Sequence, residues 1–142
     1  MPLDALPVEF LFTMTASTAD APPVVIAGPN GTRVIVTAMS GTFAGPKLNG
    51  SVANVAGGDW VKVRANGVME LDVRLVLRTD DGADIYMTYT GLGVTDGAGR
   101  KLRTVPRFET AAEQYLWLND VQAVAHGTTG TGDVTYDVYG LS

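Results

Sequence analysis

The 142-residue sequence has no cysteine and only one histidine. Without cysteine the protein has no disulfide, no zinc–thiolate site and no thiol nucleophile. The single histidine, His126, has no second histidine or glutamate at ligand spacing, so we predict no metal site. The absence of cysteine also fits a reducing compartment, and we expect a cytoplasmic location.

Long apolar runs and an excess of basic residues are missing as well. No segment approaches the roughly 20 apolar residues of a membrane-spanning helix, and no basic region followed by an apolar run suggests a signal peptide. The 10 lysines and arginines against 15 aspartates and glutamates give a net charge of −5. A chain without a basic stripe binds phosphate backbones and anionic lipid poorly, so we expect neither nucleic acid nor a membrane as partner.

Motifs for phosphate loops and serine hydrolases are also absent. The glycine-rich segments lack the Lys-Ser/Thr pair of a phosphate loop, and no Gly-x-Ser-x-Gly elbow occurs. We therefore predict no nucleotide and no other cofactor.

Glycine and proline, by contrast, are abundant. The 17 glycines and 7 prolines are spread along the whole chain, which indicates short strands joined by tight turns. With 46% hydrophobic residues the chain can form one core, so we predict a single all-β domain over residues 1–142. Strands are expected at 8–16, 32–38, 47–55, 60–65, 69–79, 83–92, 101–105, 118–126 and 134–139.

Two local signals interrupt this strand pattern. Residues 110–114 are predicted to form one helical turn, with Thr110 as N-cap and Glu113 completing a capping box. Residues 96–99, Asp-Gly-Ala-Gly, are expected to form a glycine-rich turn.

The most informative segment is residues 69–79. Glu70, Asp72 and Arg74 alternate with aliphatic residues, which is the two-residue period of a strand with one charged and one apolar face. The aliphatic set is Leu71, Val73, Leu75 and Leu77.

Residues 80–82, Asp-Asp-Gly, follow this strand and predict a three-residue hairpin loop, whose last position favours glycine. Such a loop places Arg74 opposite Thr88 and Leu75 opposite Met87. A two-residue loop would shift the register by one and mix polar with apolar faces, so the pattern favours the three-residue loop.

A set of ordered motifs covers most of the chain. The motifs are Gly41-Thr42-Phe43-x-Gly45-Pro46, Gly58-Asp59-Trp60, Glu70-Leu71-Asp72-x-Arg74, Asp80-Asp81-Gly82-Ala83, Pro106-Arg107-Phe108-Glu109-Thr110 and Tyr115-x-Trp117-Leu118-Asn119. Together they resemble the domain-of-unknown-function 3237 family. The resemblance implies a single antiparallel β-barrel of about 8–10 strands, with one short helical turn near 110–115 and a homo-oligomeric state, most simply a dimer. It implies a fold shared by small-molecule binders and cofactor-free enzymes, and no particular reaction.

The charged face of residues 69–79 has two possible placements. In a two-layer sheet Glu70, Asp72 and Arg74 face water while the leucines fill the core. In an oligomeric barrel the aliphatic face can pack against a partner subunit, and the charged residues then line the interior. Because Glu-x-Asp-x-Arg is part of the family pattern, we favour the interior placement.

A charged interior predicts acid–base chemistry. Burial raises a carboxyl pKa and a neighbouring arginine lowers it, so Asp72 or Glu70 is a candidate general base. Arg74 is expected to bind an anionic or enolizable substrate. On the same face, Tyr86 is a candidate hydrogen-bond donor to a developing oxyanion, and Thr88 is a candidate ligand contact. The alternative is a structural network of ion pairs and hydrogen bonds without a substrate.

Further ligand-binding candidates flank Pro106, which marks a strand end or bulge. Arg103, Arg107 and Glu109 are candidate anion-binding or rim residues. The alternative for Arg107 and Glu109 is a surface ion pair.

Aromatic residues and one amide complete the candidates. Trp60 and Trp117, together with Tyr115, can stack on a planar ligand or close one end of a barrel. Asn119 is either a ligand contact or the donor and acceptor of a loop-closing hydrogen bond.

Three classes of function follow. The first is a small-molecule-binding barrel that acts as a cofactor-independent isomerase, cyclase or hydratase/dehydratase on a small carbonyl or aromatic metabolite. The second is a noncatalytic ligand-binding barrel, and the third is a structural homo-oligomer with a filled core. The orientation of residues 69–79 discriminates between them. If the charges point to solvent and the leucines of this strand fill the centre, the first two classes are excluded together.

Overall fold

The computed structural model describes residues 1–97 and 99–142, and the predicted all-β fold is confirmed. Ala98, in the predicted turn at 96–99, lies outside the described residues. The strands are β1 (Val8–Ser17), β2 (Val24–Gly28), β3 (Gly31–Thr37), β4 (Gly41–Ala44), β5 (Asn49–Val52), β6 (Gly58–Val63), β7 (Met69–Thr79), β8 (Asp84–Asp96), β9 (Gly99–Thr104), β10 (Arg107–Glu109), β11 (Ala123–Thr129) and β12 (Asp133–Leu141). One 3-10 helix, η1 (Glu113–Asp120), lies between β10 and β11.

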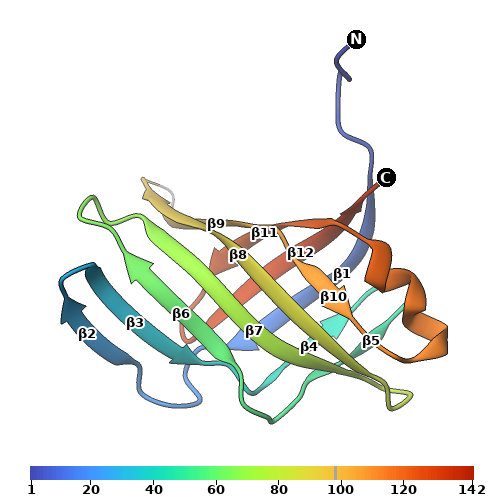
Figure 1. Ribbon diagram of the computed structural model, residues 1–142, viewed down its shortest axis with the longest axis horizontal. Helices are drawn as coiled ribbons and strands as arrows, with labels where there is room; N and C mark the ends of the chain where they lie inside the picture. Colours follow the sequence, from blue (N-terminus) through green and yellow to red (C-terminus); the bar gives the residue numbers. More distant parts are fainter. Residues whose placement is uncertain (98) are drawn as a thin grey trace.

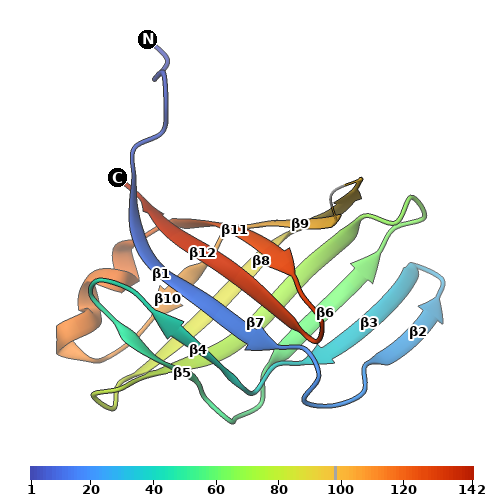
Figure 2. The same ribbon diagram turned by 180° about the vertical axis from the view of Figure 1, so that it is seen from behind.

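Eight of these strands close into an antiparallel ring. The order is β8, β9, β11, β12, β1, β4, β5 and β7, and pairing of β7 with β8 completes it. Figures 1 and 2 show the ring from its two sides, with the long strands β7, β8, β1 and β12 crossing it obliquely.

Three further strands, β6, β3 and β2, branch from the ring at β7. The C-terminal part of β7 pairs with β5, whereas its N-terminal part, from Met69 to Arg74, pairs with β6. In Figure 1 these branched strands curve away at the side opposite η1. The ring therefore has a helix end, next to η1, and an open end, flanked by β3 and β6.

The β7–β8 hairpin has the predicted register. Arg74 pairs with Thr88 and Leu75 pairs with Met87, and Gly82 in the loop has a φ of +90°. The left-handed backbone at Gly82 is the conformation that the three-residue loop requires.

The predicted interior placement of the charged face of β7 is wrong. Leu71, Val73, Leu75 and Leu77 are all buried inside the ring. Asp72 and Arg74 are exposed on its outer surface, and Glu70 is half-buried there. Burial of the aliphatic face releases apolar surface from water, while burial of unpaired charges opposes folding, so the ring closes with the leucines inside.

The predicted capping box near Thr110 is also wrong. The helix η1 begins at Glu113 and Ala112 occupies the N-cap without a side-chain hydrogen bond. The hydroxyl of Thr110 donates to the carbonyl of Asp84 at 2.8 Å and accepts from the amide of Ala112 at 3.2 Å. Thr110 thus attaches the loop to β8 instead of capping the helix.

The helix end of the ring is densely packed. Phe12 stacks edge-on against Phe43 and Phe108, with centroids 5.5 and 5.9 Å apart, and Leu118 of η1 is fully buried.

No helix in the described part of the chain is long and apolar enough to cross a membrane.

Candidate functional site

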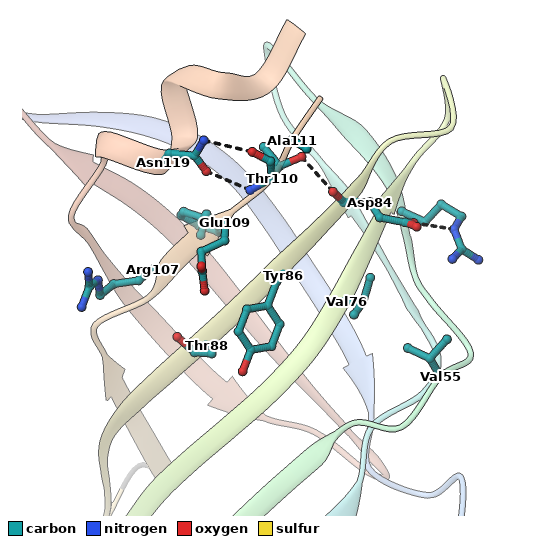
Figure 3. A pocket seen from close by; sticks show the side chains of 12 residues that line it. Val55, Val76, Asp84, Tyr86, Thr88, Arg107, Glu109, Thr110, Ala111 and Asn119 are labelled. Carbon is teal, nitrogen blue, oxygen red and sulfur yellow. Dashed lines mark hydrogen bonds and ion pairs between the residues drawn. The ribbon is translucent and has the colours of Figure 1, made fainter. Parts of the chain in front are cut away.

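Most of the predicted site residues gather on the outer surface of the ring. A groove of about 960 Å³ lies over β7, β8 and β10, and Figure 3 shows the side chains that line it. Tyr86, Thr88, Arg107, Glu109 and Asn119 line it. An adjoining groove of about 620 Å³ shares Tyr86, Thr88 and Arg107, and adds Asp72 and Arg74. The structure therefore brings these residues together, but in contact with solvent.

Ion pairs and hydrogen bonds explain several of the other predicted residues. Glu70 accepts a 2.7 Å hydrogen bond from Nε of Arg64, which lowers the pKa of its carboxyl. Asn119 donates to the carbonyl of Thr110 and accepts from its amide, at 3.0 and 2.8 Å, so it closes the loop before η1 (Figure 3).

The remaining predicted residues lie apart from one another. Trp60 is exposed on the outer surface. Arg103 is exposed and donates to the carbonyl of Leu102 at 2.9 Å. Trp117 packs against the core at the helix end, with Nζ of Lys47 4.9 Å from its ring centroid.

The interior of the ring contains a different site, at the open end. A cavity of about 480 Å³ lies among β1, β3, β6, β7, β8, β9 and β12. Its walls are mainly apolar, as is typical of small-molecule sites, and include Val34, Val36, Val61, Val63, Met69, Leu71, Val73, Leu75 and Leu102. The polar side chains of its lining include Asp59, Tyr89, Tyr136 and Arg100.

Asp59 lines the cavity because of its place on β6. It shares the inward face of that strand with Val61 and Val63, while Trp60 points outward. Gly58, immediately before it, lies against β3, where a Cβ would come within 2.3 Å of the carbonyl oxygen of Val36. Glycine at this position lets β3 and β6 approach closely and so places Asp59 at the cavity wall.

Asp59 also interrupts the β6–β7 ladder. Paired residues occur at Asp59 with Val73 and again at Lys62 with Glu70. Between these pairs the backbone amide of Asp72 donates to Oδ1 of Asp59 at 3.0 Å. The carboxylate is thus anchored by a main-chain donor, and this bond would persist in an asparagine variant.

The environment of Asp59 favours the protonated carboxyl. Desolvation by burial raises its pKa from 3.8 to about 6, the hydrogen bond from Asp72 opposes this, and the charge of Asp72 adds to it. A carboxyl with a pKa near neutrality can both accept and release a proton under physiological conditions.

Two tyrosines lie beside this carboxyl. The rings of Tyr89 and Tyr136 meet edge-on with centroids 5.3 Å apart, and their hydroxyls share a hydrogen bond. Burial raises the pKa of each phenol, and the charge of Asp59 raises both further. The hydroxyls therefore stay protonated and can donate hydrogen bonds to a bound ligand.

Gly127 on β11 makes room for Tyr136. A Cβ at Gly127 would come within 2.4 Å of Cε1 of the Tyr136 ring. A side chain there would displace the ring from its position against Tyr89.

The rim of the cavity carries charge. Arg100 and Asp133 are part of the lining, and Arg100 is exposed. An arginine at the entrance of an apolar cavity can bind an acidic group of an entering ligand. No group of three or more His, Asp or Glu side chains suited to a metal ion occurs within residues 1–97 and 99–142.

Sequence reasoning missed Asp59 although a signal was present. The strand predicted at 60–65 begins one residue after Asp59, whereas β6 begins at Gly58 and includes it. Its spacing of two and four residues from Val61 and Val63 puts a carboxylate on an apolar strand face, which is unusual without a partner or a function.

Comparison with known proteins agrees with this architecture. The family described as "Protein of unknown function (DUF3237)" matches residues 6–141. The chain belongs to this family. A UPF0311 protein from Rhodopseudomonas palustris is 30% identical to this DUF3237 chain over 150 residues, which cover 94% of this chain and 95% of the relative.

Two further similarities concern fold and activity. A protein from Acinetobacter baumannii described as beta-barrel like superposes with a TM-score of 0.89 at 28% identity, covering 99% of this chain and 100% of the other. The hydroalkoxylation enzyme phnH of Penicillium herquei is 34% identical over 92 residues, which cover 64% of this chain and 54% of the enzyme. A relative of this DUF3237 chain is thus a named enzyme.

Proposed function

We propose that this protein is a cofactor-independent enzyme that transfers protons on a small, largely apolar substrate held in the interior cavity. The reaction class that suits the site best is intramolecular addition of a hydroxyl group across a carbon–carbon double bond conjugated to a carbonyl. The observation that carries the proposal is Asp59, a carboxyl with a raised pKa of about 6 in an apolar cavity beside two tyrosine hydroxyls.

The proposed mechanism needs only groups that line the cavity. The Asp59 carboxylate takes the proton of the substrate hydroxyl, and the resulting oxygen forms a C–O bond to the double bond. The π pair of that double bond shifts to form a new carbon–carbon double bond to the carbonyl carbon, and the carbonyl π pair moves to oxygen, giving an enolate that a hydroxyl of Tyr89 or Tyr136 stabilises by hydrogen bonding. Protonated Asp59 then returns the proton to carbon, so the product is an isomer of the substrate.

The size and charge of the cavity narrow the substrate class. A volume of about 480 Å³ lies within the usual range for small-molecule sites. Its apolar walls suit an aromatic body, and Arg100 at the rim suits an acidic substituent. The name of the Penicillium herquei relative, a hydroalkoxylation enzyme, supports the same reaction class.

The test uses 2′-hydroxychalcone, which closes to a flavanone by this reaction and reports it by absorbance. We expect the wild-type protein to accelerate closure and Asp59→Asn to lower the catalysed rate at least about 100-fold, the usual range for loss of a general base. The rate should rise with pH through about 6, as the carboxylate of Asp59 forms, and then level off.

Asp120→Asn is the matched control because Asp120 is exposed at the end of η1. It makes the same chemical change far from the cavity and should leave the rate unchanged. Equal rates for wild type and Asp59→Asn would contradict the proposal. Saturable binding of the probe without acceleration would instead favour the noncatalytic binding protein.

A further inference from the structure

Two arginines flank one threonine in a row across the outer surface of the ring. Thr88 on β8 pairs with Arg74 on β7 and, on its other side, with Arg107 on β10. The side chains of the three residues lie on the outer face, and neighbouring strands are about 4.8 Å apart. Both guanidinium groups can therefore reach a ligand above the Thr88 hydroxyl.

These arginines differ from others on the same face. Nε of Arg64 and of Arg78 each lies 2.7 Å from a carboxylate oxygen, of Glu70 and Asp84 respectively. Among the described residues neither Arg74 nor Arg107 has a carboxylate within ion-pair distance. The surface ion pair considered above for Arg107 and Glu109 is thus not formed.

The surroundings of the row leave it open to a ligand. On the β6 side the residue paired with Arg74 is Gly58, which has no side chain to cover the guanidinium. Arg74, Thr88 and Arg107 line one groove of about 620 Å³. Figure 3, which draws the adjoining groove of about 960 Å³, shows Tyr86 and Thr88 side by side on β8 and the Arg107 side chain on β10 directed away from them, so a ligand above Thr88 requires this flexible side chain to turn toward it.

Apolar and acidic groups border the same groove. Val105, Val124 and Leu141 provide apolar walls, and the partly exposed ring of Tyr86 provides an aromatic surface. Asp72 lines this groove, and Glu109 lines the adjoining groove of about 960 Å³. These carboxylates disfavour a multiply charged anion and favour a single acidic group carried on an apolar body.

We propose that the row of Arg74, Thr88 and Arg107 is a second binding site, separate from the interior cavity, that takes an aromatic carboxylate. The carboxylate accepts hydrogen bonds from the two guanidinium groups and the Thr88 hydroxyl, a geometry that arginine forms well. The aromatic body lies against Tyr86 and the apolar walls. This site requires no activity of the interior cavity, so it stands or falls independently of the proposed enzymatic function.

The test is titration of the isotope-labelled protein with benzoate, followed by NMR at the backbone amides of Tyr86, Thr88 and Arg107. Benzoate should shift these amides saturably, whereas benzamide, its neutral analogue, should not. Arg74→Gln and Arg107→Gln should each weaken benzoate binding about tenfold, which corresponds to about 1.4 kcal/mol, near the lower end for a hydrogen bond to a charged group.

Arg64→Gln is the matched control, because it removes the same charge from the outer surface at a distance from the row. It should change benzoate affinity less than twofold, and an unchanged thermal midpoint in each variant shows that folding is intact. If Arg64→Gln and Arg74→Gln weaken benzoate binding equally, the loss reflects the net charge of the surface and not a specific site, and the proposal is overturned. Shifts confined to Tyr136 and Leu102, in the interior cavity, would overturn it as well.

Discussion

The two ends of the ring are built from the same long strands but have opposite interiors. At the helix end, Leu77 of β7 is 0% exposed and lies in a filled core that η1 covers. At the open end, Leu71 of the same strand lines a cavity. The branching of β6 from β7 separates the two regions, since β5 pairs with one part of β7 and β6 with the other. One apolar strand face therefore serves as core or as binding surface, according to what covers it.

The pKa shifts of the carboxyl groups also differ between the two ends of the ring. At the helix end Asp81 accepts hydrogen bonds from the hydroxyls of Thr79 and Tyr115, and these bonds lower the pKa of its exposed carboxyl. At the open end burial raises the pKa of Asp59. The first carboxyl acts as a structural acceptor, whereas the second has the protonation behaviour of an acid–base group.

The largest expected effect is on packing. Leu77→Ala should reduce the free energy of unfolding by about 4 kcal/mol, because it opens a cavity in a filled core, whereas Leu71→Ala should reduce it by about 2 kcal/mol. Leu71 already borders empty space and so has fewer contacts to lose. Urea denaturation of the two variants measures the difference, and equal losses would show that the two ends are packed alike.

A second prediction concerns the pH dependence of stability. The pKa of Asp59 is about 6 in the folded state and 3.8 without burial, so between these values the folded protein binds a proton that the unfolded chain has released. The free energy of unfolding therefore falls as pH rises toward 6. Asp59→Asn removes this penalty and should be more stable than wild type above pH 6, by about 3 kcal/mol.

Asp81→Asn provides the comparison from the helix end. The lowered pKa of Asp81 means that its carboxylate contributes stability above its unfolded pKa, and this contribution is lost as pH falls through the folded pKa. Asp81→Asn should therefore destabilise the protein at neutral pH. Chemical denaturation at pH 4 and pH 7 measures the free energy of unfolding of both variants. If Asp59→Asn and Asp81→Asn change it in the same direction at pH 7, the proposed difference between the two carboxyl groups is wrong.

The smallest effect on stability comes from removal of single hydroxyls. Tyr115→Phe removes a hydroxyl that lies 3.0 Å from both carboxylate oxygens of Asp81, and should cost about 1 kcal/mol of stability with no change in 2′-hydroxychalcone closure. Tyr136→Phe, at the open end, should change stability less but lower the closure rate about 100-fold. Thermal unfolding and the closure assay on both variants test this prediction. If only Tyr115→Phe lowers the closure rate, the reaction takes place at the helix end and not in the cavity at the open end.

Local sequence patterns were sufficient for the hairpin at the centre of the fold. The two-residue alternation along β7 and the loop at 80–82 predicted the β7–β8 register, because pairing has to keep polar and apolar faces separate. The family motifs predicted a closed antiparallel sheet. The strands β2, β4 and β10 were not predicted, since they have only 5, 4 and 3 residues and show too little alternation.

The candidate site was harder to predict than the fold. The residues chosen from sequence, such as Asp72 and Arg74, were recognised by charge, and charge on an alternating strand is most often a sign of exposure. Asp59 differs because it occupies the apolar face of its strand, where only the surrounding strands reveal its burial.

Local sequence patterns were enough to predict most of the strands, the hairpin register and the division of β7 into a charged and an aliphatic face. Those properties depend on neighbours in the chain or on one hairpin partner, and local stereochemistry fixes them. The tertiary fold determines which face lies inside, because closure of the ring places Leu71, Val73, Leu75 and Leu77 of β7 in the interior. It also decided that Asp59, Tyr89 and Tyr136, from three different strands, meet in one cavity, where burial raises the pKa of each.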